Sequence, residues 1–214
     1  MHARHALVWL QPQAAWQAVT PGAQARLADW FAAGHPAVVA RRQDGDARDL
    51  LRLGVPLPPA EGKHRLALLT VSDAIARHSP PPGLHQVMAH APEAWHDALA
   101  ALLAAARAAG QVPRVFGSVA WQATTGLDYV QHGSDLDLLW RVESAQQADA
   151  IAHVLHAWEA RYGRRADGEF LLDDGVALNW REYAGGAARL LVKAHDGCTL
   201  VARDAVWPAR RHAS

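Results

Sequence analysis

The pattern of apolar and polar positions predicts a first part of the chain built mainly from short strands. Its apolar runs are only a few residues long and are separated by polar turns, as in the strands of a sheet. Thr20 followed by Pro21 is typical of a helix start, with an N-cap and a proline at the first helical position, and Gly34 ends that helix. The strands expected in this part are residues 6–10, 37–40, 50–55 and 65–70.

The second part alternates strands and helices more regularly. Residues 92–109 have the spacing of an amphipathic helix that stops at Gly110. Ser144 with Gln147 is a capping box for a helix that ends at Gly163. A short helix is expected to end near residue 125, and the expected strands are residues 114–116, 135–141, 169–172, 176–182, 190–194 and 199–203. The order β-α-β-α-β followed by two hairpins predicts an α+β domain with a mixed sheet.

A proline-rich segment separates the two parts. Residues 79–83, Ser-Pro-Pro-Pro-Gly, can continue neither a helix nor a strand, so we place the domain boundary there. The sequence therefore predicts a smaller N-terminal α+β domain at residues 1–82 and a second domain at residues 83–214.

Composition and charge narrow the class of protein. Hydrophobic residues make up 50% of the 214 residues and charged residues 20%, which is typical of a globular chain. The 21 Lys and Arg residues balance the 21 Asp and Glu residues, which argues against a general nucleic-acid binder with its basic surface. The single cysteine, Cys198, cannot form an internal disulfide. Apolar runs such as residues 98–106 are too short to span a bilayer. We expect a soluble cytoplasmic protein that binds no membrane.

Two aspartates stand out as candidate metal ligands. Asp135 and Asp137 lie two apart in an apolar run, Asp-Leu-Asp-Leu-Leu-Trp, that is more typical of a strand than of a helix. On a strand both carboxylates point to one face, about 7 Å apart. Such a pair suits a hard cation, Mg²⁺ or Mn²⁺, that also binds phosphates. The alternative is that both are exposed positions on an edge strand without a function.

A second candidate motif precedes them, where a short apolar run breaks at Gly117-Ser118. Glycine allows backbone N–H groups to approach a ligand closely, and a helix that begins there points its positive end at a phosphate. A Gly-Ser turn followed by an Asp-x-Asp strand resembles the nucleotidyltransferases with a DNA polymerase beta-like fold. That resemblance implies a triphosphate bound at the turn, two metal-binding carboxylates and a third carboxylate on a later strand.

For the third carboxylate we favour Glu169, as a metal ligand or as the base for an attacking hydroxyl. It lies on the first strand expected after the helix that ends at Gly163. Asp167 is two residues earlier and could share the same face of the strand. For either residue the alternative is a carboxylate at a strand start with no role.

Other candidates concern the binding of phosphates and of a nucleotide base. Lys193 stands in an apolar strand, where a charge needs a reason, so we expect a phosphate contact; a solvent-facing position is the alternative. Arg181 is a weaker candidate for the same role. Trp121 could stack on an adenine ring or belong to the core. Basic residues at 41–42 and 63–65 could meet phosphates or an acidic carrier protein, although surface charge is the simpler explanation.

The interval between the Gly-Ser and Asp-x-Asp motifs is longer than usual in that superfamily. This segment and several others resemble one particular family. The relevant stretches are residues 4–10, 116–127 with Tyr129, 134–138, Gly168-Glu169, Asp174-Gly175, 177–182 and 191–193. In these stretches the chain resembles the malonate decarboxylase holo-acyl-carrier-protein synthases, which form the phosphoribosyl-dephospho-CoA transferase family.

This resemblance implies an activity. Such an enzyme transfers 2′-(5″-phosphoribosyl)-3′-dephospho-CoA from its triphosphate precursor to a serine of the apo acyl-carrier subunit of malonate decarboxylase, and pyrophosphate leaves. The second domain would be a polymerase beta-like catalytic domain that needs Mg²⁺ or Mn²⁺, and the first would bind the substrate or the carrier protein. Two alternatives stay open: another nucleotidyltransferase, such as an adenylyltransferase of a small molecule or protein, and a non-catalytic binding partner of the decarboxylase.

Overall fold

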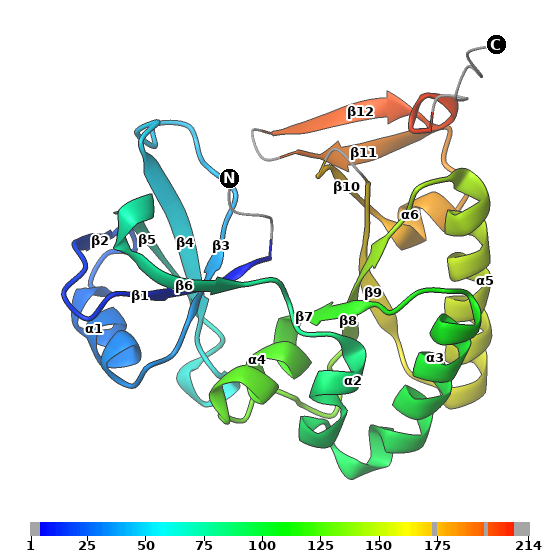
Figure 1. The fold of residues 1–214 in the computed structure, drawn as a ribbon, viewed down its shortest axis with the longest axis horizontal. Coiled ribbons are helices and arrows are strands. Elements are labelled where there is room, and N and C mark those ends of the chain that lie inside the picture. Colours follow the sequence, from blue (N-terminus) through cyan, green and yellow to red (C-terminus); the bar gives the residue numbers. More distant parts are fainter. Residues whose placement is uncertain (1–4, 173–174, 195–196, 208–214) are drawn as a thin grey trace. The chain divides into compact units, whose positions relative to one another are not determined.

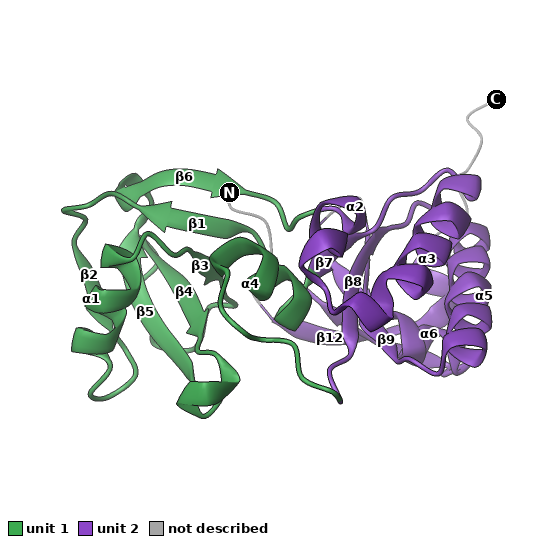
Figure 2. Ribbon diagram, turned by 90° about the horizontal axis from the view of Figure 1, so that it is seen from below, with its two compact units in different colours: residues 1–82, 116–132 green, residues 83–115, 133–214 purple. Residues whose placement is uncertain are grey.

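The computed structural model describes residues 5–172, 175–194 and 197–207 (Figure 1). The chain forms two compact units (Figure 2), the first from residues 1–82 and 116–132 and the second from residues 83–115 and 133–214. The first part of the first unit ends at the predicted boundary. The segment 116–132, expected in the second domain, belongs to the first unit.

The first unit is built on a six-stranded sheet with the order β2-β5-β4-β3-β1-β6. All of its neighbouring strands run antiparallel. The strands are β1 Leu7–Leu10, β2 Trp16–Ala18, β3 Ala37–Val39, β4 Leu50–Pro56, β5 Arg65–Val71 and β6 Ile75–Ser79. Four of them confirm the predicted strands, whereas β2 and β6 were not expected.

Helix α1 (Gln24–Ala32), which connects β2 to β3, begins later than predicted. Thr20 is not its N-cap, because the Thr20 hydroxyl accepts a hydrogen bond from the Ala67 N–H at 2.9 Å. The cap position, Ala23, has no side-chain cap. The prediction of Thr20 as the N-cap was therefore wrong: its hydroxyl joins the turn before the helix to β5.

The core of the first unit lies between its sheet and two helices, α1 and α4 (Gly117–Thr125), which lie on the same side of the strands in Figure 2. Trp30 from α1 and Trp121 from α4 are 1% and 6% exposed. The ring centroid of Trp121 lies 6.1 Å from that of Trp30 and 6.0 Å from that of Tyr129. The segment 116–132 belongs to this unit because its aromatic side chains complete the core.

The second unit contains another six-stranded sheet, with the order β12-β11-β10-β9-β8-β7. The strands are β7 Arg114–Phe116, β8 Leu136–Arg141, β9 Ala166–Leu171, β10 Ala177–Asn179, β11 Arg189–Lys193 and β12 Cys198–Ala202. Strands β8 and β9 are parallel, and those from β9 to β12 are antiparallel. The prediction of a mixed sheet in an α+β domain is confirmed.

Helices cover one face of this second sheet. The longer ones are α3 (His96–Ala108) and α5 (Ala145–Tyr162), which lie against the same face in Figure 1. The shorter ones are α2 (Leu84–Val87) and α6 (Trp180–Ala184). The hydrophobic strand residues that are at most 1% exposed are Val115, Leu136, Leu138, Trp140, Ala166, Phe170, Ala177, Leu178 and Leu190. Leu138, Trp140 and Leu190 thus bring apolar side chains to the helices.

The predicted strand at residues 176–182 was wrong in its second half. Strand β10 ends at Asn179, and α6 begins at Trp180. The side-chain oxygen of Asn179 accepts hydrogen bonds from the N–H groups of Arg181 and Glu182, so Asn179 is the N-cap of α6. The antiparallel pairing of β9 with β10 and of β11 with β12 confirms the two hairpins. Residues 173–174 and 195–196, between the paired strands, lie outside the described residues.

The remaining elements are short 3-10 turns at Pro59–Glu61, Ser72–Ala74, Met88–His90, Glu93–Trp95 and Arg203–Ala205. In the part of the chain that the structure describes, no helix has the length and apolar character needed to cross a bilayer.

A buried ion pair fixes the turn before β4. Arg52 donates to both carboxylate oxygens of Asp46, at 2.7 and 2.6 Å, and Gln43 donates its backbone N–H to the same carboxylate. The side chains of Arg52 and Asp46 are 8% and 5% exposed. The hydrogen bonds from Arg52 lower the pKa of Asp46 from 3.8 to about 2.

We expect Asp46→Asn to lower the free energy of unfolding at neutral pH by about 1.5 to 3 kcal/mol, as for lost hydrogen bonds to a charged group. Because the pKa of Asp46 is lowered on folding, its contribution is complete above about pH 4 and is lost as the pH falls toward 2. Urea unfolding at several pH values measures the difference. The exposed Asp44 of the same turn provides the control, Asp44→Asn. Equal effects of the two substitutions would contradict the role of the pair.

Candidate active site

The candidate site lies on the face of the second sheet that is opposite to its helices. Side chains alternate along a strand, and Leu136 and Leu138 of β8 are fully buried on the helix side. Asp137 between them, and Asp135 directly before β8, therefore belong to the other face. We call this face, with the side chains of Asp135, Asp137, Asp167, Glu169, Asn179 and Lys193, the polar face.

The strand register decides which carboxylates are neighbours. In the parallel pair β8–β9, Asp137 lies opposite Asp167, and Leu139 lies opposite Glu169. Residues opposite each other on neighbouring strands point to the same side, about 4.8 Å apart. The structure thus distinguishes the two candidates for the third carboxylate: Asp167 lies directly opposite Asp137, whereas Glu169 lies two residue pairs further along the strands.

Gly168 makes this close pairing sterically allowed. Its φ of 133° is in a region that other residues rarely adopt, and a Cβ at this position would lie 1.8 Å from the carbonyl oxygen of Leu138. The backbone of β9 approaches β8 so closely that no side chain fits between them. Gly168 therefore allows its two neighbours in the chain, Asp167 and Glu169, to lie close to β8.

Asp135 is arranged differently from Asp137 and Asp167. Its carboxylate forms an ion pair with the Arg165 guanidinium at 3.2 Å, and both side chains are exposed enough for water to weaken the attraction. Within residues 5–172, 175–194 and 197–207, no three His, Cys, Asp or Glu side chains are grouped closely enough to hold a metal ion by themselves. The carboxylate oxygens on the polar face nevertheless match the ligand type of Mg²⁺ or Mn²⁺, which commonly take further ligands from water and phosphate.

The side chains of the predicted residues Lys193 and Glu169 form an ion pair. The Lys193 ammonium donates to Glu169 Oε1 at 2.9 Å, and the two side chains are 24% and 6% exposed. The ion pair with Glu169 thus explains why a lysine occurs in an apolar strand. It also keeps the ammonium group on the polar face. The predicted phosphate contact of Lys193 and the catalytic role of Glu169 stay predictions.

The predicted phosphate ligand Arg181 has structural partners inside the second unit. Its guanidinium forms an ion pair with Glu159 of α5, and its Nε and Nη2 both donate to the Ala166 carbonyl, at 3.0 and 2.7 Å. These bonds join α6 to α5 and to the start of β9. Its phosphate contact also stays a prediction.

Three predicted residues, Gly117, Ser118 and Trp121, belong to α4 in the first unit, whereas the carboxylates of the polar face belong to the second unit. Helix α4 begins at Gly117, directly after β7, and Gly117 has a φ of 67°. The prediction of a helix that begins at the Gly-Ser turn is confirmed. Trp121 occupies a core position, the alternative stated for it from the sequence.

Sequence reasoning missed two residues that contact carboxylates of the polar face, Arg165 and Asn179. Arg165, the partner of Asp135, lies in the segment before β9, where the sequence has no signal for it. Asn179 donates its side-chain N–H to Asp167 at 3.1 Å. Its position before a short helix could have been recognised as an N-cap, because asparagine is a favoured cap residue.

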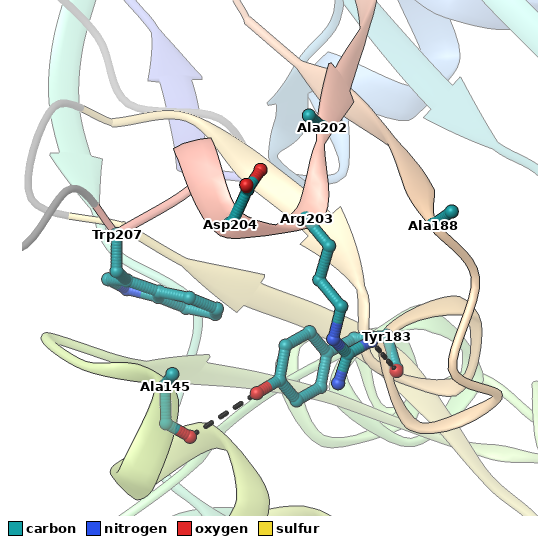
Figure 3. A pocket seen from close by; sticks show the side chains of 7 residues that line it. All are labelled: Ala145, Tyr183, Ala188, Ala202, Arg203, Asp204 and Trp207. Carbon is teal, nitrogen blue, oxygen red and sulfur yellow. Dashed lines mark hydrogen bonds between the residues drawn. The ribbon is translucent and has the colours of Figure 1, made fainter.

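A pocket of about 570 Å³ lies elsewhere in the second unit (Figure 3). The Tyr183 hydroxyl beside it donates to Asp149 at 2.8 Å, and burial raises the pKa of Tyr183 to about 12. The Arg203 guanidinium lies over the Tyr183 ring, 4.0 Å from its centroid. The lining residues are Ala145, Tyr183, Ala188, Ala202, Arg203, Asp204 and Trp207. None of them is a predicted site residue.

Comparison with known proteins identifies the family to which the chain belongs. The model of the phosphoribosyl-dephospho-CoA transferase MdcG N-terminal domain matches residues 3–81, and that of the MdcG C-terminal domain matches residues 83–204. The chain belongs to the phosphoribosyl-dephospho-CoA transferase family. Proteins with that name from Xanthomonas axonopodis pv. citri and Xanthomonas campestris pv. campestris are 57% and 56% identical over 210 residues, covering 98% of this chain and 99% of theirs. One from Bradyrhizobium diazoefficiens is 40% identical over 205 residues, covering 94% of this chain and 90% of its own. No solved structure gives a significant match.

We expect Gly168→Ala to destabilise the second unit by more than about 3 kcal/mol, because the new Cβ adds a backbone clash to a strained φ. Thermal unfolding checks this expectation. Gly163→Ala is the matched control, since Gly163 also has a positive φ, of 63°, but has open space around it. The control substitution should cost about 1 kcal/mol. Similar losses for the two variants would show that the close approach of β8 and β9 is not critical.

We expect Lys193→Met to lower the free energy of unfolding by about 1 to 3 kcal/mol, because it leaves the buried carboxylate of Glu169 without its cation. The double variant Lys193→Met/Glu169→Gln should recover part of this loss. A double-mutant cycle by urea unfolding, completed with Glu169→Gln alone, measures the coupling. Simple additivity of the two single substitutions would contradict the ion pair.

Proposed function

We propose that this protein transfers 2′-(5″-phosphoribosyl)-3′-dephospho-CoA from its triphosphate precursor to a serine of the apo acyl-carrier subunit of malonate decarboxylase, with release of pyrophosphate. The activity named for its relatives supports this proposal, since they match the chain over 98% of its length. The observation in the structure that carries it is the polar face, where Asp137 lies opposite Asp167 on a parallel strand.

The reaction is a nucleotidyl transfer, in which the transferred group stays attached to the α-phosphate of the precursor. The serine Oγ of the carrier forms a bond to the α-phosphorus of the precursor, while the bond from that phosphorus to the bridging oxygen of the β-phosphate breaks. The proton of the serine hydroxyl passes to a base, and pyrophosphate leaves with the electron pair of the broken bond. Little covalent chemistry is left to the protein, so its residues act mainly by positioning and by charge.

The carboxylates of the polar face are suited to hold divalent cations against the triphosphate. We assign this role to Asp135, Asp137 and Asp167, of which Asp135 would turn away from its ion pair with Arg165. Mg²⁺ or Mn²⁺ bound there would neutralise phosphate charge and stabilise the attacking and leaving oxygens. Glu169, the preferred third carboxylate from the sequence, is further from Asp137 and is paired with Lys193. In that pair it would orient Lys193 toward a phosphate.

The leaving pyrophosphate is assigned to the start of α4. The backbone N–H groups at Gly117 and the hydroxyl of Ser118 lie in the first turn of this nine-residue helix, whose positive end attracts an anion. We also propose a polymerase beta-like fold for the catalytic part of the chain, supported by the order β7-α4-β8-α5-β9. The single cysteine of the chain fits a reducing compartment, so we place the reaction in the cytoplasm.

The test is the mass of purified apo carrier subunit after incubation with this protein, Mg²⁺ and the triphosphate precursor. The proposal predicts that the carrier gains the prosthetic group and that one pyrophosphate is released for each group transferred. Parallel reactions with ATP in place of the precursor distinguish an adenylyltransferase, which would add AMP. Binding of the carrier without any gain in mass from either substrate would indicate a non-catalytic partner.

We expect Asp137→Asn to lower turnover by about 100- to 1,000-fold, because the variant loses charge stabilisation at the transferred phosphate. Its unfolding temperature should stay close to that of the unchanged protein, since the amide has nearly the same shape. Pyrophosphate release measures turnover. Asp97→Asn on the exposed surface of α3 is the control and should keep full activity. Normal turnover of Asp137→Asn would refute the role of the polar face.

A further inference from the structure

Asn179 connects the polar face to a helix cap through the two ends of its side-chain amide. Its Oδ1 accepts the N–H groups of Arg181 at 2.9 Å and of Glu182 at 3.2 Å. Its Nδ2 donates to Oδ1 of Asp167 at 3.1 Å. The two backbone donors determine which end of the amide is the oxygen, because an amide nitrogen in that place would face two other donors. The remaining N–H end is therefore directed at Asp167.

The same carboxylate oxygen of Asp167 has a second donor. The backbone N–H of Gly168 lies 2.7 Å from Asp167 Oδ1. In the part of the chain that the structure describes, both hydrogen bonds of this carboxylate thus reach Oδ1, and Oδ2 keeps its lone pairs. Two donors on one oxygen restrict the rotation of the carboxylate.

We propose that Asn179 is a positioning residue for the metal-binding carboxylate of Asp167. Its amide holds Oδ1, so that Oδ2 is presented to a divalent cation beside Asp137, the residue directly opposite in the sheet. This inference rests on the proposed function, because it presupposes a cation on the polar face. Hydrogen bonds to a ligating carboxylate commonly change metal affinity by about 10- to 100-fold.

The simpler explanation is that Asn179 serves only as the N-cap of α6, and substitutions can separate the two roles. Asn179→Asp and Asn179→Ser keep an oxygen that can cap the helix, since aspartate and serine are as good N-caps as asparagine. Both lose the amide N–H group that reaches Asp167, and the aspartate also adds a like charge beside it. Asn179→Ala loses the cap and the donor together.

The experiment measures Mn²⁺ binding by electron paramagnetic resonance and, separately, the Mn²⁺ dependence of pyrophosphate release. We expect Asn179→Ser to need about 10- to 100-fold more Mn²⁺ for half-saturation in both measurements, with turnover largely restored at saturating Mn²⁺. Asn179→Asp should bind Mn²⁺ more weakly than the unchanged protein in the same titration. Both variants should unfold close to the temperature of the unchanged protein, whereas Asn179→Ala should unfold at a lower temperature.

The control is Ser144→Ala, which removes the N-cap of another helix in the same unit, α5. It should lower the unfolding temperature without changing Mn²⁺ binding. Unchanged Mn²⁺ binding by folded Asn179→Ser and Asn179→Asp would overturn the inference and leave Asn179 as a cap alone. If the unchanged protein binds no Mn²⁺, or if Asp137→Asn binds it equally well, the proposed function itself fails.

Discussion

The close parallel approach of β8 and β9 is the constraint on which the candidate site depends. It requires a glycine at position 168, where any Cβ would overlap the Leu138 carbonyl. This approach fixes the register that places Asp137 opposite Asp167. A shift of β8 by one residue would turn Asp137 toward the helices and bring Leu136 or Leu138 to the polar face, because side chains alternate along a strand.

The two faces of the second sheet carry different kinds of side chain. One face buries apolar side chains such as Trp140 and Phe170 under the helices, and this burial stabilises the unit. The other face carries charges that are held by defined partners, namely Lys193 on Glu169 and Asn179 on Asp167. Phosphoryl transfer depends on charges that are in place before the substrate binds, and such partners keep them there.

Most of the elements could be predicted from the sequence, because alternation, capping boxes and turn residues act locally. The Asp-x-Asp strand and the helix after Ser144 are examples. The choice between Asp167 and Glu169 as the third carboxylate depends on the register of β8 against β9, a long-range property that a single sequence does not contain. The end of β10 at Asn179 was missed because the apolar run continues through Trp180. The place of Trp121 depends on packing against Trp30 of the distant helix α1 as well as against Tyr129, so no local pattern could predict it.

The central claim is that the polar face binds the divalent cation of the transfer reaction. Anomalous diffraction from crystals grown with Mn²⁺ and the triphosphate precursor tests it most directly. The account predicts an anomalous peak within coordination distance of the Asp137 and Asp167 carboxylates, beside a phosphate of the precursor. A bound precursor with Mn²⁺ at other residues, and none at these two, would contradict the account.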